Sequence, residues 1–182
     1  MIDIHSHLIF NVDDGPSTIK ESIEMLACAE KLGIKHIITT PHFIGNIFNG
    51  DKVENNFQEL INETRDGQIK IHLGYEVFLE PSILNIQKEG RDLTLNNTGY
   101  MLIEFPNGEI PEYSIDTVFK LQLNNITPII AHPERKRIFV NNLQMLVEWI
   151  NRGCLIQVDA ASVIGVYGFT VKNFTKKLIK KG

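Results

Sequence analysis

The sequence is poor in cysteine, with only Cys28 and Cys154 among its 182 residues, and the two lie far apart. They form no paired-cysteine motif, so the chain lacks both the disulfide framework of a small secreted domain and a cysteine-based zinc site. We expect both thiols to be buried as small apolar side chains in a reducing cytosol. The cysteine content therefore predicts a cytoplasmic protein.

Long apolar runs are also missing. No apolar stretch is long enough to span a bilayer. The sequence also shows no positively charged leader followed by an apolar run, which is the pattern of a signal peptide. The formal net charge is −4 and the sequence pI is near 5.9, which gives no general attraction to nucleic acid or to an anionic membrane. We expect no membrane insertion and no nucleic-acid partner.

Several catalytic signatures are absent as well. The sequence contains neither the P-loop pattern nor the dinucleotide-binding fingerprint, and it has no Gly-x-Ser-x-Gly nucleophile elbow. Neither cysteine is followed six positions later by arginine, so the loop of a cysteine-dependent phosphatase is missing too. These absences exclude the corresponding classes of enzyme.

The sequence does contain a regular alternation of strand-like and helix-like segments. Strands are predicted at residues 1–7, 34–40, 69–76, 100–105, 127–131 and 154–158. Helices are predicted at 19–32, 51–65, 114–124, 142–152 and 171–181, with a short helix at 79–87 and a short strand at 93–95. Six strand-then-helix units without a low-complexity linker predict one α/β domain over residues 1–182, with a parallel sheet covered by helices.

Two architectures share this alternation, the α/β barrel and the open doubly wound sheet. Chemically capable side chains lie at or just beyond the C-terminal ends of nearly all the predicted strands, namely His5, His7, His42, Glu76, Glu104 and His132. In a barrel these ends meet at one mouth, whereas an open sheet gathers its site at one switch point. We therefore favour the barrel.

The first strand carries a metal-binding pattern. His5 and His7 are two positions apart, so on a strand both imidazoles point to the same face, roughly 6.5–7 Å apart. Asp13 and Asp14 add two carboxylates in the following turn. Together with the imidazoles and the carboxylate at the other strand ends, these donors suit Zn, Mn or Fe(II). More than four candidate ligands predict two or more ions, with Glu76 able to bridge them.

Three other residues at strands receive different interpretations. His36 opens a strand and His72 lies inside one, so we predict structural roles for both. Glu104 could accept a hydrogen bond from a ligating imidazole, or it could hold the turn at Phe105 and Pro106. We favour the supporting role beside an imidazole.

A basic run, Glu-Arg-Lys-Arg at residues 134–137, directly follows His132 and Pro133. Such a run is usually a solvated face. Arg135, however, lies one turn from a predicted ligand, and its planar guanidinium matches the oxygens of a phosphate. We predict that Arg135 binds a phosphate, with Arg137 as a second contact to the substrate.

These motifs occur in an order that resembles a known superfamily. They are His5-Ser6-His7, Val12-Asp13-Asp14-Gly15, Thr40-Pro41-His42, Gly74-Tyr75-Glu76, Leu102-Ile103-Glu104-Phe105-Pro106 and Ile130-Ala131-His132-Pro133-Glu134-Arg135. Together they resemble the PHP (polymerase and histidinol phosphatase) superfamily. More narrowly, they resemble its bacterial metal-dependent protein-tyrosine phosphatases of the CpsB/CapC/YwqE type, which belong to capsule and exopolysaccharide clusters.

The resemblance implies a distorted (β/α)7 barrel with a multinuclear centre of two or three ions. Mn²⁺ is the implied metal, and the donor types leave Fe, Zn, Co and Mg open. The implied ligands are His5, His7 and Glu76 for one ion, His132 with Glu76 for a second, and Asp14 and His42 for a neighbouring position. Arg135 and Asp14 are the implied catalytic residues, Arg135 by binding the phosphate. The implied nucleophile is a metal-bound hydroxide, without a covalent phosphoenzyme.

The implied activity is hydrolysis of phosphotyrosine on the tail of a cognate bacterial tyrosine kinase, which regulates capsular or exopolysaccharide synthesis. A homo-oligomer is left open. Members of this family continue into a further strand that ends in an Asp-Ala-His type motif, and this chain contains no such motif. We therefore expect a C-terminally truncated single domain of about six β/α units, whose sheet keeps an open edge.

Two alternative functions remain at this stage. One is a small-molecule phosphatase of the PHP type acting on a substrate like histidinol phosphate, although the motifs at residues 13–15 and 105–106 favour the protein phosphatase. The other is a catalytically impaired remnant that only binds metal or a kinase tail, which the missing terminal motif favours. Measuring phosphate release from a phosphotyrosyl peptide separates the protein phosphatase from these two alternatives.

Overall fold

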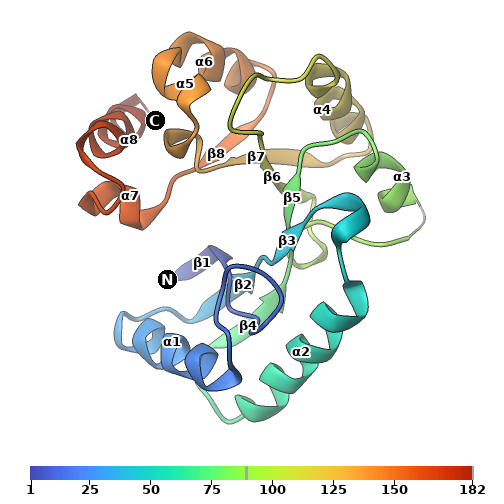
Figure 1. Cartoon of the computed structure of the whole chain (residues 1–182), viewed down its shortest axis with the longest axis vertical. Coiled ribbons are helices and arrows are strands. Elements are labelled where there is room, and N and C mark those ends of the chain that lie inside the picture. The colour runs from blue at the N-terminus through green and yellow to red at the C-terminus, as the bar shows by residue number, and fades with distance from the viewer. Residues whose placement is uncertain (89, 182) are drawn as a thin grey trace.

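The strands of the computed structural model form two parallel sheets, and the structure describes residues 1–88 and 90–181 (Figure 1). One sheet has the strand order β1-β2-β4 and the other has the order β3-β5-β6-β7-β8. The strands are β1 (Ile2–Ser6), β2 (His36–Thr39), β3 (His42–Phe43), β4 (Lys70–Leu73), β5 (Glu76–Phe78), β6 (Tyr100–Glu104), β7 (Thr127–Ala131) and β8 (Leu155–Gln157). All pairings are parallel, as expected for the predicted α/β class.

The α-helices are α1 (Ile19–Lys31), α2 (Gly50–Glu63), α3 (Ile83–Lys88), α4 (Tyr113–Leu123), α5 (Arg137–Asn141), α6 (Leu143–Asn151), α7 (Ala160–Ile164) and α8 (Phe169–Lys181). The start of α1 shows why helices begin where the sequence places them. The Thr18 hydroxyl accepts a hydrogen bond from the Glu21 amide, while the Glu21 carboxylate accepts one from the Thr18 amide. This capping box satisfies two amides that the helix itself cannot.

Two of the strand positions each consist of two short strands, and one of these short strands, β3, lies beyond the strand predicted at residues 34–40. Thr40 and Pro41 separate β2 from β3, and Gly74 and Tyr75 separate β4 from β5. Hydrogen bonds from the Gly74 amide to the Thr39 carbonyl and from the Glu76 amide to the Pro41 carbonyl carry the pairing across both breaks. Counting each broken strand once leaves six strand positions in the order of the sequence, which confirms the predicted alternation.

The two ends of this strand order remain unpaired within the described part of the chain. β1 lies at one end of the first sheet and β8 at the end of the second, and neither has a partner strand on its outer side. Figure 1 shows β1 and β8 on the same side of the molecule, with the other strands curving between them. The open edge that the sequence predicts therefore lies between β8 and β1.

Three sequence predictions are wrong in detail. Residues 93–95 form no strand, because Asn96 and Asn97 adopt left-handed backbone conformations with φ of 53° each and turn the chain there. The helix predicted at 79–87 begins only at Ile83. Cys28 is exposed on α1, whereas Cys154 is buried and burial raises the pKa of its thiol to about 12.

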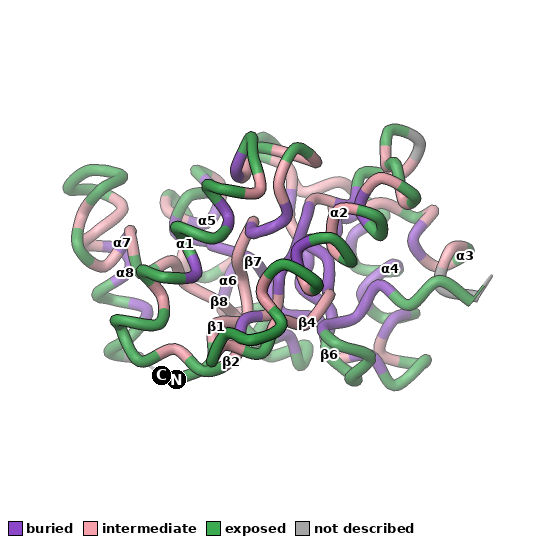
Figure 2. Tube along the Cα trace, turned by 90° about the horizontal axis from the view of Figure 1, so that it is seen from below, coloured by how far each residue is buried: buried purple, intermediate pink, exposed green. Residues whose placement is uncertain are grey.

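The main apolar core lies between the five-stranded sheet and the helices that cover it. Residues of α4, α6 and α8 pack there, and Phe105 contacts the rings of Phe139 and Trp149 at centroid distances of 5.5 and 5.0 Å. A smaller cluster of Leu8, Leu26, Ile37 and Leu60 joins β1 and β2 to α1 and α2. Figure 2 shows the buried segments in the interior of the molecule and exposed segments on the outer helices, and β6 and β7 are buried along most of their length.

A third apolar cluster brings together side chains from strands of both sheets, β1, β2, β6 and β7. It contains Leu95, Leu102, Ile129 and Ala131, with Ile4 and Ile38 packed against it. Leu95 comes so close to β4 that a Cβ added at Gly74 would lie 2.9 Å from its Cδ2 atom. This cluster therefore joins the two sheets by apolar contacts. No helix in the described ranges is both long enough and apolar enough to cross a membrane.

Replacing Phe105 by alanine should lower the free energy of unfolding by about 3–5 kcal/mol, because a fully buried ring leaves a cavity between Phe139 and Trp149. Urea unfolding followed by circular dichroism measures the change. Phe119→Ala is the matched control, since 57% of the Phe119 side chain is exposed. Equal loss in both variants would contradict this description of the core.

Candidate metal centre

The predicted ligands are brought together by the parallel arrangement of the strands. His5 lies in β1 and His7 follows it, His42 begins β3, Glu76 begins β5, and His132 follows β7 directly. His42 and Glu76 are direct partners in the register of β3 and β5. Because the C-terminal ends of parallel strands meet at one edge, side chains from distant parts of the sequence share one site.

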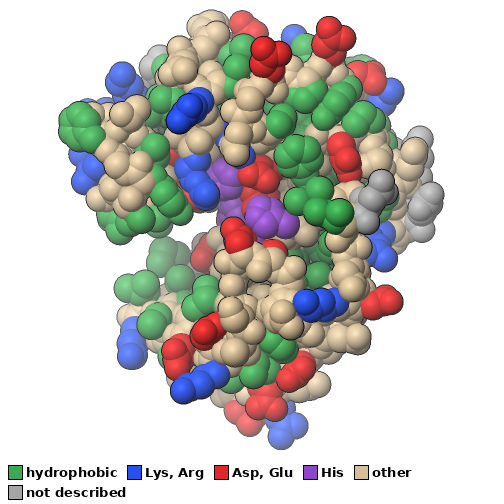
Figure 3. Space-filling view, viewed as in Figure 1, with side chains coloured by type: hydrophobic (Ala, Val, Ile, Leu, Met, Phe, Trp, Pro, Cys, Tyr) green, Lys and Arg blue, Asp and Glu red, His purple; other side chains and the backbone are tan. Residues whose placement is uncertain are grey.

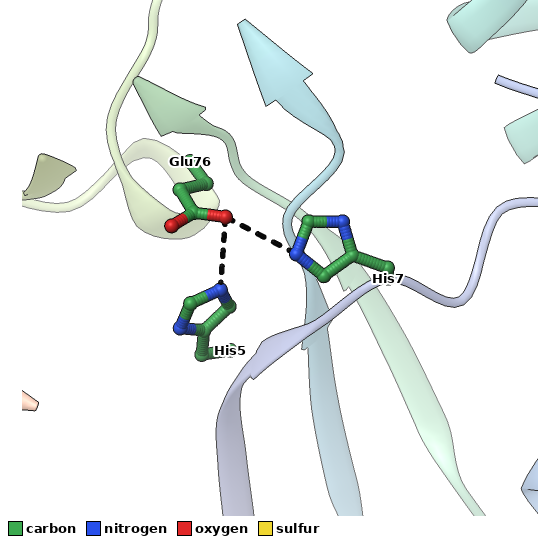
Figure 4. Close-up of side chains that lie close together, drawn as sticks. All are labelled: His5, His7 and Glu76. Carbon is green, nitrogen blue, oxygen red and sulfur yellow. Dashed lines mark hydrogen bonds and ion pairs between the residues drawn. The ribbon is translucent and has the colours of Figure 1, made fainter. Parts of the chain in front are cut away.

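The centre of the site is the carboxylate of Glu76, whose side chain is only 1% exposed. One oxygen, Oε2, lies 3.2 Å from His5 Nε2, 3.1 Å from His7 Nε2 and 3.4 Å from His42 Nδ1. The other, Oε1, lies 2.7 Å from His132 Nε2. Figure 4 shows His5 and His7 both directed at this carboxylate. A single carboxylate thus faces four imidazoles.

The charges of these groups depend on one another. Burial by itself raises the pKa of the Glu76 carboxyl, but hydrogen bonds with His132, His5 and His7 hold it well below its usual range. Burial lowers the pKa of His7, yet its contacts with Asp13 and Glu76 raise it to about 10. The pKa of His5 is raised as well, by Glu76 and Gln157 against the effect of burial. The arrangement favours the ionised form of the Glu76 carboxylate.

Asp13 and Asp14 have different positions in the turn after β1. The Oδ2 atom of Asp13 lies 2.8 Å from His7 Nδ1 and accepts a hydrogen bond from the His42 amide, while Oδ1 accepts one from the Gly15 amide. Asp13 therefore orients His7 and leaves its Nε2 atom facing Glu76. The Asp14 side chain is 74% exposed, and its Oδ1 atom lies 3.3 Å from His7 Nδ1 and 3.5 Å from His42 Nε2.

The backbone at the site is constrained at two residues. A Cβ added at Gly15 would lie 2.6 Å from the His7 carbonyl oxygen, so the turn that carries Asp13 and Asp14 requires glycine. His132 adopts a left-handed conformation with φ of 31°, which is unfavourable for a residue with a side chain. This strain lies where β7 ends, at the residue whose imidazole contacts Glu76.

Among the described residues, three overlapping groups of side chains have the geometry to hold an ion. They are His5, His7 and Glu76; His7, Asp14 and His42; and His42, Glu76 and Glu104, with ligand atoms within 4.8 Å of one another in each group. The Nδ1 atoms of His42 and His132 are buried without a hydrogen-bond partner, which leaves donor atoms available to a metal. Imidazoles with carboxylates suit Mn, Fe or Zn. The residues present therefore fit a divalent metal.

Glu104 has two neighbours of opposite character. Its Oε2 atom lies 3.9 Å from His42 Nδ1, and its Oε1 atom accepts a hydrogen bond of 2.6 Å from the ammonium group of Lys136. Lys136 is only 4% exposed and also donates to the Asn107 side chain. Sequence reasoning grouped Lys136 with a solvated basic run, whereas the structure buries it as the partner of Glu104.

The side chains border a cavity of about 450 Å³ whose lining includes Arg135, Asp159 and Tyr167. The guanidinium of Arg135 lies 3.1 Å from Asp159 Oδ2, and its Cζ atom is 4.7 Å from the centre of the Tyr167 ring. Arg137 is exposed at the start of α5 and is not among the residues that line this cavity. Figure 3 shows the histidines at the surface of a hollow, beside acidic and basic side chains.

Several residues of the site were assigned no role from the sequence. Glu134 is fully buried and accepts a hydrogen bond from the Asp159 amide, and Gln157 contacts both His5 and Asp159. Tyr167 follows α7, in a segment without a regular pattern. His36 and His72, predicted to be structural, hydrogen-bond each other at 3.1 Å between β2 and β4. They take no part in the contacts around Glu76.

Comparison with known proteins identifies relatives along the whole chain. The family model described as capsular polysaccharide synthesis, CpsB/CapC, matches residues 1–182. CapC of Staphylococcus aureus is 37% identical over 183 residues, covering 98% of this chain and 72% of the relative. The tyrosine-protein phosphatase YwqE of Bacillus subtilis (strain 168) is 33% identical, covering 99% of this chain and 72% of the relative.

A solved structure gives the same result for the fold. It comes from a study of YwqE from Bacillus subtilis and CpsB from Streptococcus pneumoniae, described as unique metal-dependent tyrosine phosphatases. It superimposes with a TM-score of 0.92 at 32% identity and covers 99% of this chain and 74% of the solved chain. By sequence over its full length and by structure, the chain belongs to the CpsB/CapC family of capsular polysaccharide synthesis.

Proposed function

We propose that this protein is a metal-dependent tyrosine-protein phosphatase that uses Mn²⁺ to hydrolyse phosphotyrosine. The observation that carries the proposal is the convergence of four imidazoles on the buried Glu76 carboxylate, at a cavity whose wall includes Arg135. The relatives described above as tyrosine-protein phosphatases support the same activity.

Each predicted ligand has a place in this proposal. His5, His7 and Glu76 would hold one ion, His132 would share Glu76 with a second, and Asp14 and His42 would hold a neighbouring one, with Glu104 supporting His42. Bound divalent ions supply positive charge for the phosphoryl oxygens and make a coordinated water more acidic. Asp13 keeps His7 oriented, and the exposed Asp14 carboxylate lies at the mouth, where it can also take up a proton.

Arg135 is proposed to bind the phosphoryl group. Its guanidinium borders the cavity and is held between the Asp159 carboxylate and the Tyr167 ring, so it is oriented before substrate arrives. A planar fork of N–H donors matches two phosphate oxygens. The described residues that line the cavity include no cysteine, so we propose that water attacks the phosphorus directly and that tyrosine leaves as the phenol.

The proposed substrate is the phosphotyrosine tail of a bacterial tyrosine kinase, and the proposed role is regulation of capsular or exopolysaccharide synthesis in the cytoplasm. The description of the family model, capsular polysaccharide synthesis, supports the pathway. A cavity at the molecular surface, bordered by an exposed arginine, suits the side chain of a protein substrate better than an enclosed pocket would.

We also propose that the open edge between β8 and β1 accepts a seventh strand that brings further ligands to the site. Ile2 on β1 and Leu155 on β8 are exposed apolar residues on the two unpaired strands. Unpaired strand edges readily pair with another segment. The relatives contain residues beyond the matched region, since this chain covers 72% of their length.

The first prediction concerns metal dependence. The 182-residue chain with added Mn²⁺ should release phosphate from a phosphotyrosyl peptide, lose that activity after thorough chelation, and regain it when Mn²⁺ returns. Malachite-green detection of phosphate measures each state. Activity that survives chelation would overturn the metal mechanism, and release from histidinol phosphate alone would favour the small-molecule phosphatase.

Glu76→Gln should abolish this activity and weaken Mn²⁺ binding, because the neutral amide removes the negative charge that four imidazoles share. Glu63→Gln on the exposed face of α2 is the matched control and should behave as the unaltered chain. Full activity in Glu76→Gln would show that the site lies elsewhere.

The second prediction concerns the phosphate contact. Arg135→Ala should lower kcat/KM for the phosphotyrosyl peptide roughly 10- to 100-fold, since a hydrogen bond to a charged group contributes about 1.5–3 kcal/mol. Arg65→Ala, exposed beyond α2, should leave the kinetics unchanged. Arg137→Ala tests the other predicted contact, and a raised KM there would assign Arg137 to the substrate. Unchanged kinetics in Arg135→Ala would remove Arg135 from the site.

The third prediction concerns the open edge. A chimera that adds to the end of this chain the further strand with the Asp-Ala-His type motif that the family resemblance implies should bind Mn²⁺ more tightly and show a higher kcat than the 182-residue chain, because the added strand supplies ligands and covers the edge. Isothermal titration and steady-state kinetics measure the two effects. Identical affinity and kcat in both proteins would contradict the proposal, as would an added segment that fails to protect the β1 and β8 amides from hydrogen exchange.

A further inference from the structure

The side chain of Gln157, at the end of β8, makes three hydrogen bonds inside the candidate metal centre. Its Oε1 atom lies 3.0 Å from His5 Nδ1 and accepts a hydrogen bond of 3.1 Å from the His132 amide. Its Nε2 atom donates to Asp159 Oδ1 over 3.2 Å. Sequence reasoning assigned no role to this residue.

The orientation of the Gln157 amide follows from two partners whose roles are unambiguous. The backbone amide of His132 can only donate, so the side-chain atom facing it must be the oxygen. The carboxylate of Asp159 can only accept when it is ionised, so the atom facing it must be the nitrogen. Both contacts select the same orientation and exclude the flipped one.

This orientation decides which nitrogen of His5 carries a proton. An amide oxygen accepts hydrogen bonds only, so the Nδ1 atom of His5 must be protonated. In the neutral ring that a metal requires, Nε2 is then unprotonated, and it is the atom that lies 3.2 Å from Glu76 Oε2. Gln157 thus selects the tautomer that presents a free electron pair to the site.

The same amide reaches the other functional part of the site through Asp159. While Oδ1 of Asp159 accepts from Gln157, Oδ2 lies 3.1 Å from the Arg135 guanidinium, and the Asp159 amide donates to Glu134 over 2.8 Å. Arg135 also rests on the Tyr167 ring. The Gln157 side chain therefore contacts His5 directly and reaches the Arg135 guanidinium through Asp159.

We infer that Gln157 is a positioning residue for two functional side chains. The Oε1 atom of Gln157 orients the metal-binding imidazole of His5, and its Nε2 atom orients the phosphate-binding guanidinium of Arg135 by holding Asp159. This inference rests on the proposed function, since it assumes a metal at His5 and a phosphate at Arg135. The contact also joins β1 to β8, two strands without backbone pairing, between residues that are 152 positions apart in the sequence.

Two substitutions separate the two halves of this role. Gln157→Leu removes the acceptor for His5 and the donor for Asp159 together. Gln157→Glu keeps oxygen acceptors for His5 and for the His132 amide, but it sets a carboxylate against the carboxylate of Asp159. Gln144→Leu, exposed on α6, is the matched control. Thermal unfolding of all three checks that each variant is folded.

Metal binding is measured without turnover, by electron paramagnetic resonance titration of free Mn²⁺. Gln157→Leu should weaken Mn²⁺ binding roughly 10- to 100-fold, the usual cost of removing the partner of a ligating imidazole. Gln157→Glu should keep the affinity within a few-fold and raise KM for the phosphotyrosyl peptide, because Asp159 no longer holds Arg135 in place. The control should match the unaltered chain in both measurements.

The tautomer is read directly by nitrogen-15 resonance of the histidines in the Zn²⁺-loaded chain. The His5 signals should show a protonated Nδ1 and a metal-bound Nε2 in the unaltered chain and in Gln157→Glu. In Gln157→Leu the signals should lose this pattern. A merely structural role for Gln157 would lower the unfolding temperature without changing the tautomer or shifting KM in Gln157→Glu.

The outcomes distinguish this inference from the proposed function. If the unaltered chain binds neither Mn²⁺ nor Zn²⁺, the metal centre itself is refuted. If it binds both ions, and Gln157→Leu binds them with the same affinity and the same His5 tautomer, the positioning role is refuted while the metal centre stands. An unchanged KM in Gln157→Glu would refute the link to Arg135 alone.

Discussion

The burial of one carboxylate, that of Glu76, is the constraint on which the rest of the site depends. An ionised carboxylate away from water costs several kcal/mol unless opposite charge or hydrogen bonds compensate it. Here the compensation comes from four imidazoles. Two lie in strands, one in β1 and one in β3, and the other two directly follow β1 and β7. Because no local segment could supply four such partners, the charge of Glu76 is tolerated only in the complete fold.

The positions of these partners could be predicted from the sequence because they depend on strand ends. Apolar β-rich segments that stop at a proline or at a turn mark where each strand ends, and parallel strands bring those ends to one edge. His42 beside Pro41 and His132 before Pro133 are examples. The order of the six strand positions also follows the order of the sequence, so the general fold could be inferred before any contact was known.

Other features of the site could not be predicted from the sequence, because they depend on the direction in which a side chain points. Hydrophobic periodicity does not indicate that direction for residues in loops. Asp13 and Asp14 are adjacent and chemically alike. Asp13, however, accepts hydrogen bonds from two backbone amides and contacts His7, whereas Asp14 is exposed at the cavity. Lys136 and Arg135 are also adjacent, and only Lys136 is buried. Gln157 has no distinguishing motif at all, because its role comes from partners that are remote in the sequence.

The breaks in two of the strands have a mechanical consequence. His5 belongs to the three-stranded sheet, whereas His42 and Glu76 belong to the five-stranded one, so the site spans both sheets at the point where the strand breaks join them. An ion held from both sides acts as a cross-link between them. Because such an ion binds the folded chain, its stabilisation grows with its concentration, by about 2.7 kcal/mol when the free ion reaches 100 times its dissociation constant. A divalent metal at this site would therefore add to the backbone hydrogen bonds that already join the two sheets, and its supply would set the size of that addition.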